Sequence, residues 1–184
     1  VDSTEEFAVL CVDDPVVAEL AVARPDATTY GYDARARVRA IDYRPTRTGC
    51  ELAITIDGEP PLVMPLRLRG RDMAQNALGA LSLACRLGVD PQVAISALGT
   101  FSGVARRFQF RASLNGADCY DDYAHTATEV RTTLARAREG GWDRVVAVFQ
   151  PHRYTRIHRH GTEFATAFDD ADVVVVAGLD PAFE

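Results

Sequence analysis

Two clusters of polar side chains in the second half of the chain contain residue types that bind phosphates and carboxylates. Their members are Asp121, Asp122 and His125 in the first cluster, and Gln150, His152, Arg153 and Arg156 in the second. Arginine grips a carboxylate or a phosphate through two parallel hydrogen bonds, and aspartate holds ribose hydroxyls or a metal-bound phosphate. A single such residue is more often a solvated surface charge. The indication of a site therefore comes from the clustering.

The elements around these clusters explain why they would lie together. The sequence predicts a strand over 118–123, a helix over 126–139 and a second strand over 144–149, which is the order of a βαβ unit. Thr126 and Glu129 have the spacing of a capping box, and the apolar run 145–149 is typical of a strand buried in a parallel sheet. Because right-handed crossovers bring such strands side by side, we expect both clusters to face one crevice at the carboxyl ends of the strands.

The rest of the chain also has α/β character. Short strands are predicted over 8–12 and 27–30, an antiparallel meander over 35–68, and helices over 15–23, 72–87 and 90–98. Asp13 and Asp14 precede Pro15, and we interpret them as the start of a helix in preference to a pair of catalytic acids. A hinge over 101–107 is predicted to separate two units, 1–102 and 103–184.

Composition excludes several classes of protein. The chain has 184 residues, of which 47% are hydrophobic, and a formal net charge of -6. Such a chain is globular, and its charge argues against wholesale binding of nucleic acid or of an anionic membrane. No apolar run is long enough to span a bilayer, and the four cysteines are spaced like reduced thiols, so we expect a cytoplasmic protein. Three histidines between 152 and 160 lack a recognised ligand spacing, and no metal site is expected there.

Every basic residue is arginine, so the chain has no P-loop of the form GxxxxGK[ST]. It therefore cannot bind ATP through a Walker loop of its own.

Five segments resemble the Mur ligase family and follow in the family's order across almost the whole chain. They are VDDP at 12–15, GRDMAQNALGA at 70–80, FSGVARRFQ at 101–109, DDYAHTATE at 121–129 and FQPHRYTR at 149–156. The resemblance is closest to the branch that joins L-alanine to UDP-N-acetylmuramate.

The resemblance implies an ATP- and Mg²⁺-dependent, amide-forming ligase of peptidoglycan synthesis, and hence a role in cell shape and cell division. The muramate carboxylate would be phosphorylated, and the amine of L-alanine would attack the acyl phosphate. Residues 1–102 would be the second half of the central ATPase domain with an antiparallel β flap, and residues 103–184 the first part of a Rossmann-like C-terminal domain. The amino-terminal domain, the P-loop and most Mg²⁺ ligands would lie outside this chain, which alone would be inactive.

Site residues follow from the same resemblance. It places Asn76 beside the adenine, Arg107 at the nucleotide phosphates, Asp122 at the ribose, His125 near the γ-phosphate and the acyl phosphate, and His152, Arg153 and Arg156 at the carboxylate of the incoming amino acid. Two departures stand out. Asp72-Met73 replaces His-Asn or His-Met, which puts a carboxylate near an anionic nucleotide, and Thr126-Ala127 replaces His-Pro.

Two alternatives remain open at the level of sequence. One is the related ligase that salvages murein tripeptide, which shares these motifs. The other is a non-catalytic nucleotide-binding or regulatory module derived from the same fold.

Overall fold

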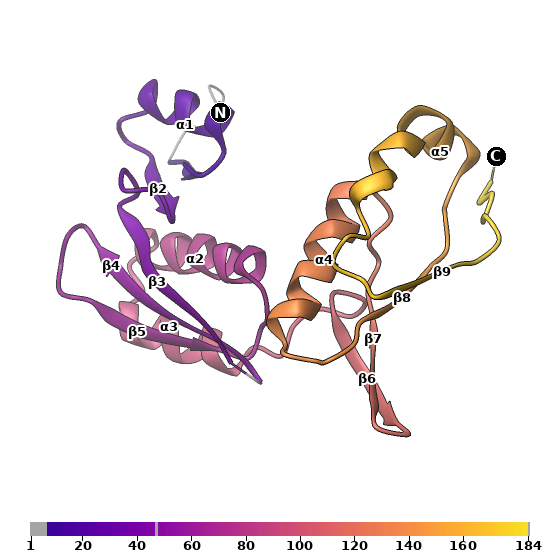
Figure 1. Cartoon of the computed structure of the whole chain (residues 1–184). Coiled ribbons are helices and arrows are strands. Elements are labelled where there is room, and N and C mark those ends of the chain that lie inside the picture. Colours follow the sequence, from indigo (N-terminus) through magenta and orange to yellow (C-terminus); the bar gives the residue numbers. More distant parts are fainter. Residues whose placement is uncertain (1–6, 47, 184) are drawn as a thin grey trace. The chain divides into compact units, whose positions relative to one another are not determined.

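The computed structural model describes residues 7–46 and 48–183, and the chain divides into two compact units, Val1–Ser102 and Gly103–Glu184 (Figure 1). The elements of the first unit are β1 (Val9–Cys11), α1 (Pro15–Val22), β2 (Thr28–Gly31), β3 (Val38–Thr46), β4 (Gly49–Ile56), β5 (Leu62–Leu66), α2 (Arg71–Arg86) and α3 (Pro91–Thr100). Those of the second are β6 (Gln109–Leu114), β7 (Ala117–Asp121), α4 (Ala127–Glu139), β8 (Val146–Phe149), α5 (Tyr154–His160), the 3-10 helix η1 (Gly161–Thr166) and β9 (Val173–Val176).

The first unit is built on a five-stranded mixed sheet with the order β1-β2-β3-β4-β5. β1, β2 and β3 are parallel neighbours, whereas β3, β4 and β5 pair antiparallel, which confirms the predicted meander. Asp57 and Gly58 turn the chain between β4 and β5 with positive φ angles of 51° and 80°. Asp and Gly are residues that tolerate this conformation.

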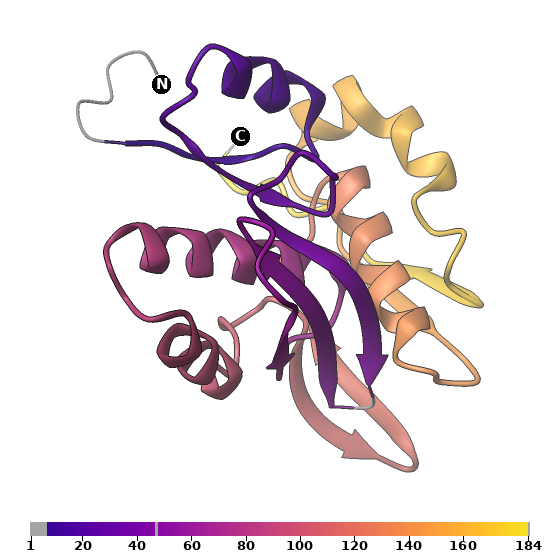
Figure 2. The same ribbon diagram turned by 90° about the vertical axis from the view of Figure 1, so that its left-hand side faces the viewer.

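Helices α2 and α3 lie on one side of the strands β3, β4 and β5 (Figure 2). Alternate residues of the strands point towards them, and Leu52, Ile54 and Met64 are completely buried together with Leu78 and Leu81 of α2. Ala74 and Ala77 of α2 are buried in this core, and their small side chains permit the close packing.

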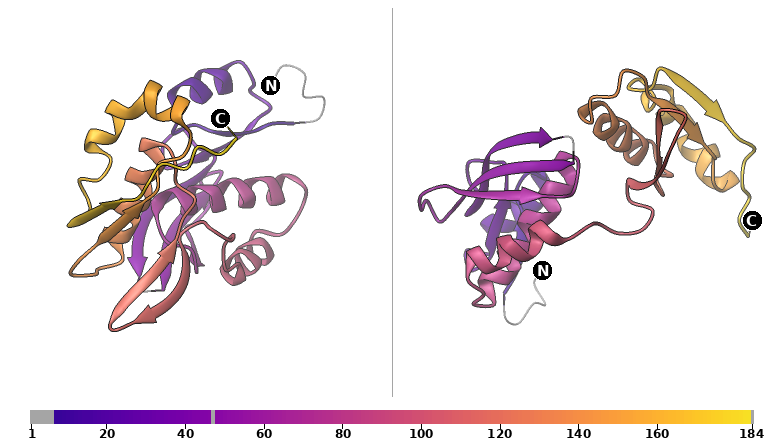
Figure 3. Two further views of the ribbon diagram at one scale, coloured as in Figure 1. Left: turned by 90° about the vertical axis from the view of Figure 1, so that its right-hand side faces the viewer. Right: turned by 90° about the horizontal axis from the view of Figure 1, so that it is seen from below.

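In the second unit, β6 and β7 form an antiparallel hairpin, and β8 and β9 form a separate parallel pair (Figure 3). The prediction that the strands over 118–123 and 144–149 are parallel neighbours is therefore wrong for the described part of the chain. The turn Asn115-Gly116 explains the difference. Both residues have positive φ angles, 52° and 83°, as a two-residue hairpin turn requires, and they direct β7 back along β6.

A pocket of about 580 Å³ lies between β7, α4 and β8. Its lining includes Tyr120 of β7, Leu134 of α4, Trp142 of the loop after α4, and Val146 and Val148 of β8. The rings of Tyr120 and Trp142 meet edge to face at 5.3 Å, and Trp142 Nε1 donates a hydrogen bond to Asp118. The pocket thus occupies the place where direct pairing of β7 with β8 was expected.

The core of the second unit is formed by α4, β8 and the aromatic residues of the segment after α5. Val130 and Leu134 of α4 are buried with Val145 and Phe149, and the rings of Phe164 and Phe168 pack against Phe149. No disulfide links the cysteines of the described residues, and Cys119 on β7 is exposed. In the described residues, no helix has the length and apolar character needed to cross a membrane.

Candidate active site

The first polar cluster follows β7 in the loop that leads into α4. Thr126 caps α4 by accepting a hydrogen bond from the Glu129 amide, and Glu129 accepts hydrogen bonds from the amides of Thr126 and His125. His125 Nδ1 lies 2.9 Å from the carbonyl oxygen of Tyr123. Because a carbonyl only accepts, Nδ1 must carry a hydrogen, and Nε2 is the acceptor of a neutral ring. The capping box therefore fixes the backbone of His125, and Tyr123 orients its ring.

Glu129 gives this loop a pH dependence. Burial tends to raise the pKa of Glu129, but hydrogen bonds from the His125 and Thr126 amides outweigh it, so the pKa lies below its ordinary value. A carboxyl group with a lowered pKa stabilises the fold above its unfolded-state pKa, and this contribution is lost as the pH falls through the folded-state pKa. As the pH falls below about 5, the free energy of unfolding should therefore decrease less in the Glu129→Gln variant than in the wild type. Urea unfolding at pH 7, 5 and 3 measures this, with Glu59→Gln in an exposed turn as the control.

The second polar cluster begins after β8. His152 forms an isolated parallel bridge with Asp180, and the Arg153 amide donates to the Asp180 carbonyl at 2.8 Å. Arg156 NH1 lies 3.2 Å from His152 Nδ1 and 3.4 Å from the His152 carbonyl oxygen. Since a guanidinium only donates, His152 Nδ1 is the acceptor and its hydrogen sits on Nε2. Arg156 and His152 are thus held as a unit.

Arg153 adopts a backbone conformation that non-glycine residues rarely use. Its φ is 68°, it stands at the N-cap of α5, and its side chain is exposed. Such a conformation costs about 1–3 kcal/mol and persists only where the surroundings enforce it. Here the hydrogen bond to Asp180 contributes to that enforcement. The strain coincides with a predicted substrate-binding residue.

The structure brings one residue of each cluster together. The rings of His125 and His152 are 6.4 Å apart between centroids, with an interplanar angle of 66°. One imidazole oriented by a carbonyl and another paired with a guanidinium therefore share one region of the second unit. The side-chain amide of Gln150 instead donates a hydrogen bond to the Gly178 carbonyl.

Asp122 and Arg107 lie near the start of the second unit. Asp122 Oδ2 accepts from the Phe108 amide at 2.7 Å and Oδ1 from the Ala124 amide at 2.8 Å. Arg107, one residue before Phe108, is exposed. Asn76 belongs to α2 in the first unit and is also exposed, with its amide nitrogen 3.9 Å from Met73 Sδ. The expected ribose ligand Asp122 thus already holds two backbone amides.

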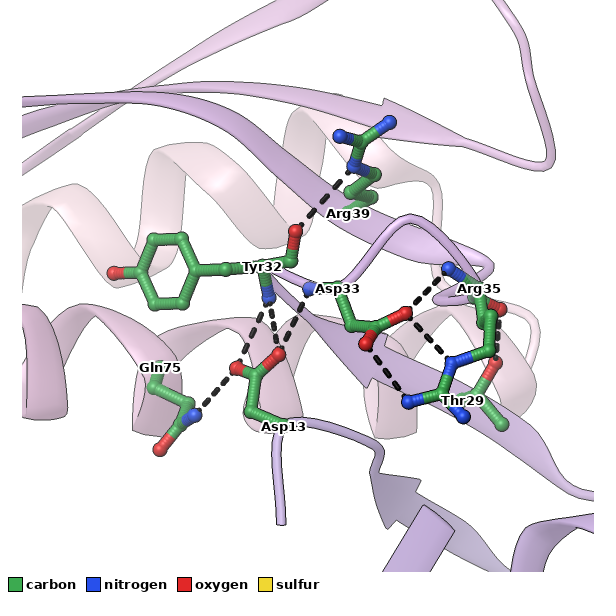
Figure 4. A network of polar contacts seen from close by, with 7 residues as sticks. All are labelled: Asp13, Thr29, Tyr32, Asp33, Arg35, Arg39 and Gln75. Atoms are coloured by element: carbon green, nitrogen blue, oxygen red, sulfur yellow. Dashed lines mark hydrogen bonds and ion pairs between the residues drawn. The ribbon is translucent and has the colours of Figure 1, made fainter. Parts of the chain in front are cut away.

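Asp13 has a role that the sequence did not reveal (Figure 4). Asp14 caps α1 as expected, but the Asp13 carboxylate accepts hydrogen bonds from the amides of Tyr32 and Asp33 and from Gln75 Nε2 of α2. It therefore ties the loop after β1 to the loop after β2 and to the helix turn that contains Asn76. The two acids follow one another in the sequence, but only Asp14 belongs to the helix start.

No group of three or more His, Cys, Asp or Glu side chains within residues 7–46 and 48–183 has the arrangement of a metal site. The three histidines between 152 and 160 do not converge on a common point with acidic partners. His160 pairs with an acid, Glu163, at 2.7 Å, whereas His152 contacts Arg156.

Comparison with known proteins supports the resemblance of these motifs to those of the Mur ligases. Residues 106–184 match the family model described as Mur ligase, glutamate ligase domain. The UDP-N-acetylmuramate--L-alanine ligase of Bradyrhizobium sp. (strain ORS 278) is 39% identical over 188 residues, which is 97% of this chain. The same enzyme of Methylobacterium nodulans is 40% identical over the same share of the chain. This chain is a relative of the Mur ligases.

Solved Mur ligase structures have the same fold. The UDP-N-acetylmuramate-alanine ligase of Thermotoga maritima superposes with a TM-score of 0.80 at 28% identity, covering 95% of this chain and 38% of that one. A Mur ligase structure from Thermotoga maritima in complex with ADP gives a TM-score of 0.75 at 16% identity, which shows the fold alone. The predicted fold class is thereby confirmed. The chain spans 40% of the length of the curated relatives it matches.

Proposed function

We propose that this chain forms the part of a UDP-N-acetylmuramate--L-alanine ligase that handles the nucleotide phosphates and the incoming amino acid. The observation that supports this most is the meeting of His125 with His152 and Arg156 beside the strained Arg153. A region with an oriented imidazole and two guanidinium groups fits two anions that must be brought close together. Those anions are a phosphorylated carboxylate and an amino acid carboxylate.

In this proposal each of these side chains has its own role in binding or transfer. Arg153 and Arg156 bind the carboxylate of L-alanine, with His152 holding Arg156 in place, so the amine of L-alanine remains available to attack. His125 donates a hydrogen bond from Nε2 to the oxygens that are transferred, which requires a hydrogen on both ring nitrogens. Ligases of this kind depend on positioning and on stabilisation of charge in the transition state. The reaction would serve peptidoglycan synthesis in the cytoplasm.

The cofactors fit only in part. ATP supplies the phosphoryl group, and the exposed Arg107 is a suitable partner for its phosphates, with Asp122 near the ribose and Asn76 near the base. For Mg²⁺ the described residues contain no cluster of acids that could hold it. On this proposal, the Mg²⁺ ligands and the P-loop would come from the part of a Mur ligase that this chain does not match.

Substitution of Arg156 tests the amino-acid site. The suitable enzyme is a chimera in which this chain replaces the matching segment of the Bradyrhizobium ligase. We expect Arg156→Met to raise the KM for L-alanine by about 10- to 100-fold, since a charge-assisted hydrogen bond contributes about 1.5–3 kcal/mol. The KM for UDP-N-acetylmuramate should not change. Arg159→Met, on the exposed face of the same helix, is the control.

The same measurement separates the two alternatives. An unchanged KM for L-alanine in the Arg156→Met chimera would contradict the amino-acid site. If the chimera prefers a murein tripeptide over L-alanine, the chain belongs to the salvage ligase. If the chimera binds ATP but forms no amide bond with either substrate, the non-catalytic module is favoured.

A further inference from the structure

The segment 106–108 is held in an unusual backbone conformation. Arg106 and Phe108 have positive φ angles of 59° and 47°, and Arg107 lies between them. For side chains other than glycine, asparagine or aspartate this conformation is uncommon, and each instance costs about 1–3 kcal/mol. Neither residue can keep it without restraint from neighbouring groups.

The restraint comes from the loop after β7. The Tyr123 amide donates to the Arg106 carbonyl at 2.9 Å, and the Arg106 guanidinium lies over the Tyr123 ring at 4.4 Å. The Phe108 amide donates to Asp122 Oδ2 at 2.7 Å. These contacts hold the residues on both sides of Arg107, so the exposed Arg107 is presented from a fixed backbone.

Arg136 of α4 contacts two of the residues in this arrangement, Asp122 and Phe108. Its side chain is only 5% exposed, its NH1 is 3.7 Å from Asp122 Oδ2, and its Cζ is 5.2 Å from the centroid of the Phe108 ring. Burial of a guanidinium is costly unless it is matched by a charge and by hydrogen bonds. A buried arginine that contacts both Asp122 and Phe108 therefore indicates a specific structural task.

We propose that Arg136 is a positioning residue that acts through Asp122 and Phe108 on Arg107. Its charge balances Asp122, which otherwise would place an uncompensated carboxylate near the anionic phosphates assigned to Arg107. Its flat guanidinium fixes the Phe108 ring, and with it the left-handed backbone on the carboxyl side of Arg107. The link to nucleotide binding rests on the proposed function, whereas the structural coupling of Arg136 to Phe108 does not.

Amide hydrogen exchange followed by NMR tests the structural coupling in the 184-residue chain. In Arg136→Met we expect the Phe108 amide to exchange at least about tenfold faster, while the amide of Leu134 in the same helix keeps its rate. Arg136→Lys keeps the charge but loses the planar group, and should give the same selective change to a smaller degree. Arg131→Met, on the exposed side of α4, should leave the Phe108 rate unaltered.

A Phe108 exchange rate equal to that of the wild type, in either folded Arg136 variant, would overturn the proposal. If Arg136→Met accelerates the exchange of every amide of the second unit, that variant has unfolded. The exchange rates of the Arg136→Lys variant then decide the question. In that variant a selective change at Phe108 supports the proposal, and a uniform change or none contradicts it.

The ligase chimera then tests the functional consequence. Arg107→Ala and Arg136→Met should each raise the KM for ATP, and the double variant should show no further increase, because both act on one interaction. If Arg136→Met leaves this KM unchanged while Arg107→Ala raises it, the positioning role is wrong. If Arg107→Ala has no effect, the nucleotide assignment in the proposed function fails, while the exchange result for Arg136 stands by itself.

Discussion

Gly31→Ala is expected to destabilise the first unit by about 3 kcal/mol, which lowers the melting temperature of that unit by roughly 12 °C or more. A Cβ at this position would lie 2.5 Å from Asp13 Oδ1, and the φ of Gly31 is 147°. The added methyl group therefore meets the carboxylate that binds the Tyr32 and Asp33 amides. Strain in the backbone and loss of these hydrogen bonds act in the same direction.

Gly58→Ala provides a matched control for this prediction. Gly58 also has a positive φ, 80°, but an added Cβ would meet no atom within 4 Å. Its substitution should cost only about 1 kcal/mol, from the backbone alone. Equal melting temperatures for Gly31→Ala and Gly58→Ala, measured by circular dichroism, would show that the Asp13 contacts contribute little to the first unit.

His125→Ala is expected to lower the kcat of the ligase chimera by about 10²- to 10³-fold. The KM values for L-alanine and for UDP-N-acetylmuramate should change little. Removal of one oriented hydrogen-bond donor from a site that stabilises developing negative charge typically has this effect. The Tyr123 carbonyl fixes the ring of His125, so its Nε2 does not have to be ordered during the reaction. The backbone amide of His125 donates to Glu129 at 3.0 Å, whereas its ring lies 3.5 Å from the same carboxylate, so the start of α4 should survive the substitution.

The control for His125 is His158→Ala, because His158 is exposed on α5. It should keep the activity of the unsubstituted chimera. A His125→Ala enzyme with an unchanged kcat would remove His125 from the catalytic site and leave it as a residue of the helix start.

Local signals in the sequence predicted a large part of this fold. The capping box of Thr126 and Glu129 correctly gives the start of α4, and the turn residues between 35 and 68 correctly give the antiparallel strands β3, β4 and β5. These signals involve residues close in the chain, where backbone preferences and hydrophobic spacing dominate.

Contacts between distant segments were harder to predict. The Asp13 carboxylate bonds Tyr32 and Gln75, which lie 19 and 62 positions further along the chain, and no local pattern marks such a pairing. Arg136 follows Leu134 by two positions, or roughly 200° around a helix, so periodicity places it away from the apolar face. It is buried because the segment 106–108 and Asp122 cover that side of α4.

His125 and His152 lie close together as expected, but the strand pairing behind that expectation is incorrect. Asn115-Gly116 is a strong hairpin signal that would have paired β7 with β6. The loop after β7 and the segment after β8 nevertheless bring His125 and His152 together without direct pairing of the two strands.

Product formation by the ligase chimera tests the central claim most directly. UDP-N-acetylmuramate, ATP and Mg²⁺ are incubated with the purified chimera, with and without L-alanine, and the products are identified by mass spectrometry. We expect UDP-N-acetylmuramoyl-L-alanine together with one ADP for each amide bond formed, and neither product in quantity without L-alanine. A chimera that folds and binds ATP, but forms no such product under conditions in which the parent Bradyrhizobium enzyme does, would contradict it.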